Sequence, residues 1–591
     1  MITLTECQLW SRLCLGLWVG AAAMGAAAEP SGTSAACGAA VPFITIEAED
    51  PANRTSGLVV KLSKLPSGLD NSPELEASGR AYVELRQTGD FLEIPKTPAG
   101  NGLVIRHCIP DAPQGGGITA TLGLYVNGKR RQTLRLSSKH NWLYGTGKLG
   151  ENGQSNQPTK FPHVFWDEAR WIVEGGLKAG DSLRLQKDAT DNAEFYRIDL
   201  LELEPIPPPL PQPANSLSIA TYGAKGQDAT ADTAAIRKCI EEAQAQGKTV
   251  WLPAGTFLQN AAFTVRGVRV QGAGMWHTSL CNVPGTAPKN WSGCGGFVLA
   301  GSNPSVSDLY MDGLETTSRG AEGAKAFTGG GTNWSVRNVW IAHAHVGFWV
   351  GGIGGTVSGC RVRFSYADGI NINNGGGHGP AHNILVENNH VRGTGDDGLA
   401  ILGEAPRKGP HQTLNVTLRH NTVAAVWWGG NCDLAGGNGH LIEDNVFADG
   451  GSAYNLGLNL PAAFPMCSLT GAIVRRNLII RGGNNYASQR RGAIWIYPGT
   501  ASIASTVIED NRIIAPLFRG IHLAGSSSQQ IVFKGNLIEH PGEDAIVIDG
   551  KVTGRGTFTA NTVRNLNPGR KPLANSAGES YKLVQTGNSW K

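Results

Sequence analysis

The sequence is short of charged residues. Asp, Glu, Lys and Arg make up 17% of the 591 residues, against about 25% in an average soluble protein. The 51 basic residues nearly balance the 47 acidic ones, and the formal net charge is +4. A nucleic-acid-binding surface needs a concentrated basic excess, so we expect no nucleic-acid partner. The 15 tryptophans on a weakly charged chain favour contact with neutral sugars instead.

Cysteine is also sparse, and its spacing excludes the common zinc and redox motifs. The chain has 10 cysteines, and no two of them have the C-x-x-C spacing. Cys281 and Cys294 are the pair expected to form a local disulfide if the protein is exported. Cys360 falls at a repeat position described below and is expected to be a buried thiol.

Long apolar runs are missing except at the N-terminus. The uncharged run from Leu13 to Ala28 has 16 residues, and a membrane span requires ~20. Arg12 precedes the run, and small residues end it, as at the cleavage site of a secretory signal. We predict that residues 1–28 are a cleaved signal peptide. The protein is then secreted, to the extracellular space or the periplasm, without a membrane partner.

Prolines concentrate in one short segment that divides the rest of the chain. Residues 206–217 are too rich in proline for a helix and are predicted to be an extended linker. Before it, residues 40–205 contain short alternating runs such as Ala81–Leu85, separated by turn signals such as Asn127-Gly128. This pattern predicts a β-sandwich. A second domain is predicted over residues 218–591.

Glycine is abundant, and the second domain repeats. The 80 glycines are roughly twice the average share and follow no collagen period. A motif of an apolar residue, two polar residues, Asn, any residue and an apolar residue recurs. Its Asn falls at 338, 389, 421, 445, 477, 511, 536 and 561, with Cys360 in its place once. Such spacing predicts a coiled solenoid whose asparagines stack as a ladder at one internal bend.

A helix is predicted at the entrance of this solenoid. It runs from Thr233 to Gln246, with Asp232 as N-cap and Gly247 as stop. Together with the following strand Thr249–Phe257, it resembles the entrance of the pectate-lyase-like superfamily of right-handed parallel β-helices. There the helix covers an end that would otherwise expose a sheet edge and the core. The expected fold class is all-β, a right-handed parallel β-helix preceded by a β-sandwich of jelly-roll type.

Alignment of the coils on the repeated Asn brings carboxylates together. Asp368 lies eight residues after Cys360, and Asp397 lies eight after Asn389. Equivalent residues of successive coils stack about 4.8 Å apart, so Asp368 and Asp397 are expected to lie one above the other with Asp396 beside them. Crowded carboxylates raise at least one pKa and leave a proton donor beside ionised bases. Glycosidic cleavage needs this combination.

Two other interpretations of these aspartates remain open from the residues alone. Asp-Gly is common turn chemistry, and carboxylates also bind calcium. Glu543-Asp544 occupies the register of Asp396-Asp397 in a later coil. However, Asp544 stacks on Arg519 rather than on a carboxylate, so the aspartate cluster is the better candidate for catalysis.

Aromatic and basic residues near the cluster are candidates for binding substrate. Trp427 and Trp428 follow in the next coil, with Trp428 near the register of Asp397. Consecutive strand residues point oppositely, so at least one of the two rings is expected to be exposed to a sugar. The other candidate cleft residues are Trp349, Tyr366, His345, His378 and Arg491.

The motifs around the aspartates carry a family resemblance. Tyr366–Gly369 followed by Gly395–Ile401 resembles the catalytic signature of β-helix glycoside hydrolases, including polygalacturonases. The next coil has Trp427–Gly430 where polygalacturonases have Gly-His-Gly, and the basic groups that bind uronates are missing. A sandwich joined to a β-helix with three aspartates resembles glycoside hydrolase family 87, which comprises α-1,3-glucanases and mycodextranases.

The resemblance implies endo-hydrolysis of a neutral α-glucan with inversion. Asp396 would be the general acid, and Asp368 and Asp397 would position and deprotonate the water. No cofactor is required for this chemistry, and the chain is expected to be a monomer. The sandwich resembles carbohydrate-binding modules, which implies a structural calcium with Glu47, Glu49 and Asp199 as candidate ligands.

Two further classes of function remain alternatives. One is a calcium-dependent polysaccharide lyase or a polygalacturonase-like enzyme on the same fold, for which Arg392 and Arg491 are the basic residues nearest the cluster. The other is a non-catalytic glycan-binding solenoid.

Overall fold

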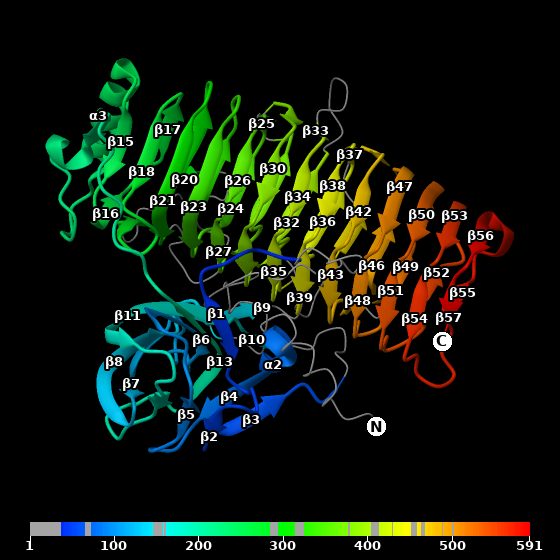
Figure 1. Ribbon diagram of the computed structural model, residues 1–591, viewed down its shortest axis with the longest axis horizontal. Coiled ribbons are helices and arrows are strands. Elements are labelled where there is room, and N and C mark those ends of the chain that lie inside the picture. The colour runs from blue at the N-terminus through cyan, green and yellow to red at the C-terminus, as the bar shows by residue number, and fades with distance from the viewer. Residues whose placement is uncertain are drawn as a thin grey trace, which may run out of the picture. The chain divides into compact units, whose positions relative to one another are not determined.

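The computed structural model describes an almost entirely β chain (Figure 1). It describes residues 37–64, 72–145, 158, 161–283, 294–313, 324–375, 379–403, 413–427, 429–450, 458–461, 467–486, 489–498, 501–526 and 528–590. Residues 37–591 form one compact unit. The predicted signal peptide, 1–28, lies outside the described residues. None of the helices in the described part of the chain has the length and apolarity that a membrane crossing requires.

The first part of the chain is the predicted β-sandwich. Its strands are β1 (Ile44–Glu47), β2 (Arg54–Thr55), β3 (Leu58–Lys61), β4 (Ala81–Leu85), β5 (Phe91–Ile94), β6 (Gly100–Cys108), β7 (Thr119–Val126), β8 (Lys129–Ser137), β9 (Trp142–Gly145), β10 (Phe161–Val164), β11 (Asp167–Leu177), β12 (Leu183–Gln186) and β13 (Tyr196–Glu204). Within the described ranges, one antiparallel sheet has the order β11-β6-β13-β4-β3, with β1 on β13, and the other has the order β2-β5-β12-β7-β8. Alternate residues such as Leu122 and Leu124 are buried in the core between the sheets. A short hairpin, β9-β10, stands apart from both sheets.

The second part is a right-handed parallel β-helix, as expected. One of its sheets is parallel throughout and consists of β17 (Phe263–Arg266), β20 (Cys294–Ala300), β22 (Lys325–Gly329), β24 (Val346–Val350), β28 (Ile370–Asn373), β32 (Leu399–Leu402), β36 (Cys432–Ala435), β40 (Leu458–Pro461), β46 (Gly492–Tyr497), β49 (Arg519–Leu523), β52 (Ile546–Ile548) and β55 (Leu573–Asn575). We call it the site sheet. The remaining strands, from β14 (Ser216–Ser218) to β57 (Ser589–Trp590), form the other faces of the coils, except β44 (Asn485–Tyr486) and β45 (Gln489–Arg490), which pair only with each other among the described residues (Figure 1). Stacked apolar side chains fill the interior, such as Phe327 on Phe348 with ring centroids 4.8 Å apart.

The predicted helix α3 (Thr233–Gln246) closes the entrance of the solenoid (Figure 1). Gly247 ends it in the left-handed conformation with φ +63°, as a C-terminal glycine should. Asp232 is the N-cap residue, but its carboxylate does not cap the helix. It accepts hydrogen bonds from the amides of Lys225 and Leu258 at 2.8 and 2.9 Å, and so ties the helix to the flanking loops.

The asparagine ladder is confirmed over most of the solenoid. Each Nδ2 donates to the Oδ1 of the next coil's asparagine at 2.9–3.0 Å, from Asn389 to Asn588. The assignment of Asn338 to the ladder is wrong by one residue, because Trp340 pairs with Arg361 and therefore Val339 aligns with Cys360. Asn338 takes the left-handed turn position, with φ +52°.

The cysteine predictions have different outcomes. Cys360 is a buried thiol, as expected. The expected Cys281–Cys294 disulfide is wrong, because Cys281 is a free thiol. It lies on β19 (Thr278–Asn282), within the parallel sheet of the coils.

Buried ion pairs join the sandwich to the solenoid. Arginines of β27 (Arg361–Arg363) and β31 (His390–Arg392) meet glutamates of β11 and β13. The pairs are Arg361–Glu204 at 2.7 Å, Arg363–Glu168 at 3.0 Å and Arg392–Glu202 at 2.6 Å. The proline-rich segment is also tied down, because the Leu210 amide donates to the Ala273 carbonyl at 2.9 Å. The segment therefore does not act as a free tether, and β14 begins at Ser216, inside the predicted linker range.

Candidate active site

The three predicted aspartates meet just before the N-terminal ends of β28 and β32, near the middle of the site sheet. Ile370 pairs with Leu399, so the residues two places earlier, Asp368 and Asp397, stack as the repeat alignment predicted. One carboxylate oxygen from each of Asp368, Asp396 and Asp397 lies within 4.8 Å of the other two. Asp368 and Asp397 are buried, whereas Asp396 is partly exposed and accessible to substrate. In the described residues this is the one acidic, histidine or cysteine group compact enough to share an ion.

Asparagine side chains orient Asp368. The Asn371 Nδ2 donates to Asp368 Oδ2 at 2.9 Å, and the Asn373 Nδ2 donates to Asn371 Oδ1 at 3.0 Å. Both asparagines lie on β28 and are almost fully buried. Neither asparagine was among the candidates predicted from the sequence, although residues 371 and 373 lie on one face of a strand next to the aspartate.

A fourth carboxylate, Asp433 on β36, adjoins the cluster and was also not identified. The Asp433 side chain is hydrogen-bonded to Asp397. Burial and then the neighbouring charges of Asp433, Asp396 and Asp368 raise the pKa of Asp397 well above its ordinary value. Burial likewise raises the pKa of Asp433, so the pair holds a proton under conditions in which isolated aspartates are ionised.

The coil after Asp397 contributes glycines rather than a tryptophan. Gly430, not Trp428, is in register with Asp397, and its amide donates to Asp397 Oδ1 at 2.6 Å. This corrects the predicted position of Trp428, which itself lies outside the described residues. The register differs because Gly430 follows Asn421 by nine residues, one more than separates Asp397 from Asn389. A Cβ at Gly429 would lie 2.6 Å from Asp396 Oδ1, so this close approach requires glycine.

Aromatic residues pack together beside the aspartates, and one of them comes from the sandwich. Trp427 is buried and packs edge-on against Phe165 of the sandwich, with ring centroids 4.6 Å apart. Trp427 therefore offers no ring face to a sugar, contrary to its prediction as a binding platform. Tyr366 is buried in the same cluster, whereas Trp349 is half-buried beside it.

The remaining predicted cleft residues have different surroundings. Burial, and next the charge of Lys325, lower the pKa of His345 to about 3, so its ring is neutral and cannot supply a proton. The Arg491 guanidinium lies over the ring of Trp495, 4.0 Å from its centroid. Trp495 lies on β46, which is three strands beyond β32 in the site sheet, so Arg491 does not lie with the aspartates. His378 lies outside the described residues.

The candidate calcium ligands fit a cation in part. Glu47 Oε2 and Glu49 Oε2 are buried with no hydrogen-bond partner among the described residues. Burial and neighbouring carboxylates raise the pKa of Glu47 to about 8 and that of Glu49 to about 9. Asp199 differs, because it forms an ion pair with Arg106 and accepts the Ser78 amide at 2.9 Å. The three carboxylates do not converge on a common point as the aspartates do.

Three protein-family models match regions of this chain. Residues 40–206 match "Alpha-1,3-glucanase catalytic domain D1", and residues 229–458 match "Alpha-1,3-glucanase catalytic domain D2". Residues 346–580 match "Right handed beta helix region". A search among curated proteins finds no match by sequence.

Solved structures share the whole architecture. The chain is 26% identical to the structure of the Agl-KA catalytic domain, with a TM-score of 0.81, over 95% of this chain and 100% of that one. A family 87 α-1,3-glucanase catalytic domain in complex with nigerose is 24% identical, with a TM-score of 0.79, over 94% and 100%. The catalytic unit of a Streptomyces thermodiastaticus α-1,3-glucanase is 22% identical, with a TM-score of 0.74, over 93% and 97%.

These matches cover both the sandwich and the solenoid, and the two domain models describe halves of one catalytic unit. The protein is therefore a glycoside hydrolase. Within that class, the chain belongs to glycoside hydrolase family 87, the family of the α-1,3-glucanases.

Proposed function

We propose that the protein is a secreted, endo-acting α-1,3-glucanase that cleaves its neutral glucan with inversion, with Asp368, Asp396 and Asp397 as the catalytic residues. The observation that carries the assignment of residues is the convergence of these three carboxylates within 4.8 Å. The nigerose bound in a structural neighbour supports an α-1,3-linked substrate. Nigeran is a further candidate substrate.

The roles of the three aspartates follow from the resemblance to family 87 and from the exposure of Asp396. Asp396 is the most exposed of the three and donates its proton to the glycosidic oxygen as the C–O bond breaks. Asp368 and Asp397 hold a water on the opposite face of the sugar and accept its proton as the new C–O bond forms. Because water attacks from the face opposite the leaving group, the first product is the β-anomer.

The test is hydrolysis of α-1,3-glucan, nigeran, dextran and polygalacturonate by the purified chain, with and without EDTA. We expect reducing ends from the first two, with β-anomers detected by proton NMR, and no effect of EDTA. Asp396→Asn is expected to lower kcat about 10²–10⁴-fold. Asp544→Asn is the matched control, because Asp544 has the same strand register without a carboxylate above it.

Three outcomes would contradict the proposal. EDTA-sensitive release of ultraviolet-absorbing unsaturated products from polygalacturonate would indicate a lyase. Full activity of Asp396→Asn would remove the assigned acid, and binding without cleavage of any glucan would indicate a glycan-binding solenoid.

We propose that Glu47 and Glu49 hold a structural calcium in the sandwich. Their buried, unpartnered oxygens support this, since a cation would replace the protons that the raised pKa values otherwise demand. Calcium at 100 times its Kd should stabilise the fold by about 2.7 kcal/mol, seen as a higher Tm. Glu49→Gln should abolish the difference between calcium and EDTA. A Tm that is the same in both for the wild type would disprove this site.

A further inference from the structure

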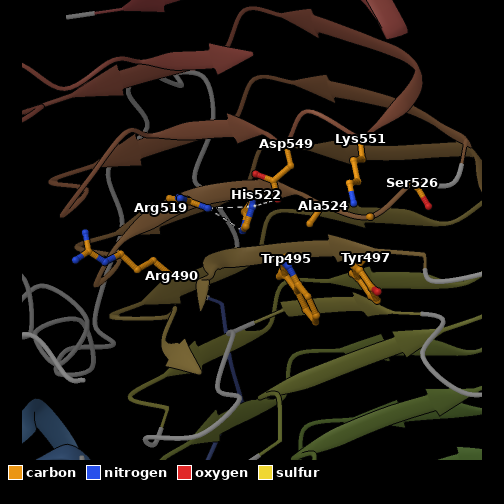
Figure 2. A pocket seen from close by; sticks show the side chains of 10 residues that line it. Arg490, Trp495, Tyr497, Arg519, His522, Ala524, Ser526, Asp549 and Lys551 are labelled. Carbon is orange, nitrogen blue, oxygen red and sulfur yellow. Dashed lines mark hydrogen bonds and ion pairs between the residues drawn. The ribbon is translucent and has the colours of Figure 1, made fainter. Parts of the chain in front are cut away.

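A cavity opens on the site sheet, towards the C-terminal end of the solenoid. Its volume is about 590 Å³. Figure 2 shows the rings of Trp495 and Tyr497 side by side on β46, with Asp549 and Lys551 across from them. Side chains from three successive coils line it, among them Trp495, Tyr497, Arg519, His522, Asp549 and Lys551.

Strand register connects this cavity to the aspartates. Asp433 pairs with Asn459, Asn459 with Trp495, and Trp495 with His522. At about 4.8 Å for each strand, Trp495 lies roughly 10 Å beyond Asp433 along the solenoid, and His522 roughly 14 Å. A polymer bound at the aspartates and continuing towards the C-terminal coils therefore passes the cavity within a few sugar residues.

The lining is polar, but its charges are largely paired. His522 Nε2 lies 3.0 Å from Asp549 Oδ2, and Arg519 Nη1 lies 3.0 Å from the same ring nitrogen. Arg519 also faces Glu543 at 3.8 Å. Paired side chains such as these offer donors and acceptors to hydroxyl groups without a large excess of either charge. An anionic ligand would instead require several unpaired cations.

The two rings form a fixed block at one side of the cavity. They stack at 5.1 Å with planes 6° apart, and Arg491 covers the other face of Trp495. Trp495 is 8% exposed, so Tyr497, half-buried at the open end of the block, is the ring that a ligand can touch. A rigid ring beside convergent polar groups is typical of a small-molecule or sugar site.

We propose that this cavity is a second saccharide-binding site, which holds the part of a neutral glucan that extends from the aspartates towards the C-terminal coils. It rests on the proposed function. The site adds affinity for long chains and takes no part in bond cleavage.

The experiment measures binding of α-1,3-glucan to the Asp396→Asn chain, so that cleavage does not interfere. Adding Tyr497→Ala, or separately Ser526→Trp to fill the cavity from an exposed position, should weaken binding roughly tenfold, or about 1.4 kcal/mol. Lys582→Ala, an exposed lysine on β56 (Tyr581–Thr586), is the control and should bind as the parent does. Equal Tm values for parent and variants establish that each is folded.

The remaining outcomes separate this proposal from the function on which it rests. If the Asp396→Asn chain binds the glucan and both cavity variants bind it within twofold of the parent, the second site is disproved and the catalytic assignment stands. If the wild-type chain cleaves no α-glucan and the Asp396→Asn chain binds none, both proposals fail. Tighter binding of dextran sulfate than of the glucan, abolished by Lys551→Ala, would overturn the neutral ligand class.

Discussion

At the scale of single residues, we expect Asp433 to raise the pKa of Asp397. It shares a hydrogen bond with Asp397, and after burial its charge is the largest cause of the raised Asp397 pKa. An amide at position 433 keeps a donor for Asp397 and removes that charge. Asp433→Asn should therefore lower the pKa of Asp397 and move the acidic limb of the kcat/KM–pH profile to lower pH.

The size of the loss in kcat/KM distinguishes a residue that shifts the pKa of Asp397 from a catalytic residue. Asp433→Asn should cost less at the optimum than the roughly 10²–10⁴-fold expected when a general acid or base is lost, as in Asp397→Asn. Asp228→Asn, an exposed turn residue near helix α3, controls for a general change of charge. An acidic limb that stays in place in Asp433→Asn would show that the two carboxylates titrate independently.

At the scale of elements, the features that could be predicted from the sequence are those that repeat. Every ladder asparagine from Asn389 to Asn561 meets the same bend, so the same local pattern returns at each coil. The stacking of Asp368 on Asp397 was predictable because both follow their ladder position by eight residues. One additional residue in the next coil was enough to place Gly430, instead of Trp428, beside Asp397.

Contacts between elements far apart in sequence could not be predicted in the same way. Trp427 is buried because Phe165 of the sandwich covers it, and no pattern near Trp427 in the sequence predicts that contact. Asp433 was not identified because it lies within a strand, outside the Asp-Gly pattern that marked the other aspartates. The glutamates of β11 and β13 likewise have arginine partners that lie ~160–220 residues later in the chain.

At the scale of the whole molecule, a buried histidine links the sandwich to the solenoid. His343 Nε2 lies 2.8 Å from Asp167 on β11, and its Nδ1 lies 2.7 Å from Asp312, the last residue of β21 (Ser305–Asp312). His140 stacks on the ring at 3.8 Å, and the Tyr310 hydroxyl donates to Asp312 at 2.6 Å. Burial alone would lower the pKa of His343, but the two carboxylates overcome it and raise the pKa to about 10.

The contacts of His343 with Asp167 and Asp312 predict that the protein is most stable on the acidic side of neutrality. The folded pKa of His343 lies above its unfolded value of about 6.5, so its contribution is complete below pH ~6.5 and is lost as the pH rises towards 10. Burial alone would raise the pKa values of Asp167 and Asp312, but His343 lowers them. Their contribution to stability is therefore lost as the pH falls below about 4.

His343→Gln should lower the free energy of unfolding by about 3–5 kcal/mol at pH 6 and flatten its decline between pH 6.5 and 10. Urea unfolding at a series of pH values measures both effects, with the exposed His540→Gln as control. An alkaline decline of the same steepness in His343→Gln would assign the pH dependence to other groups.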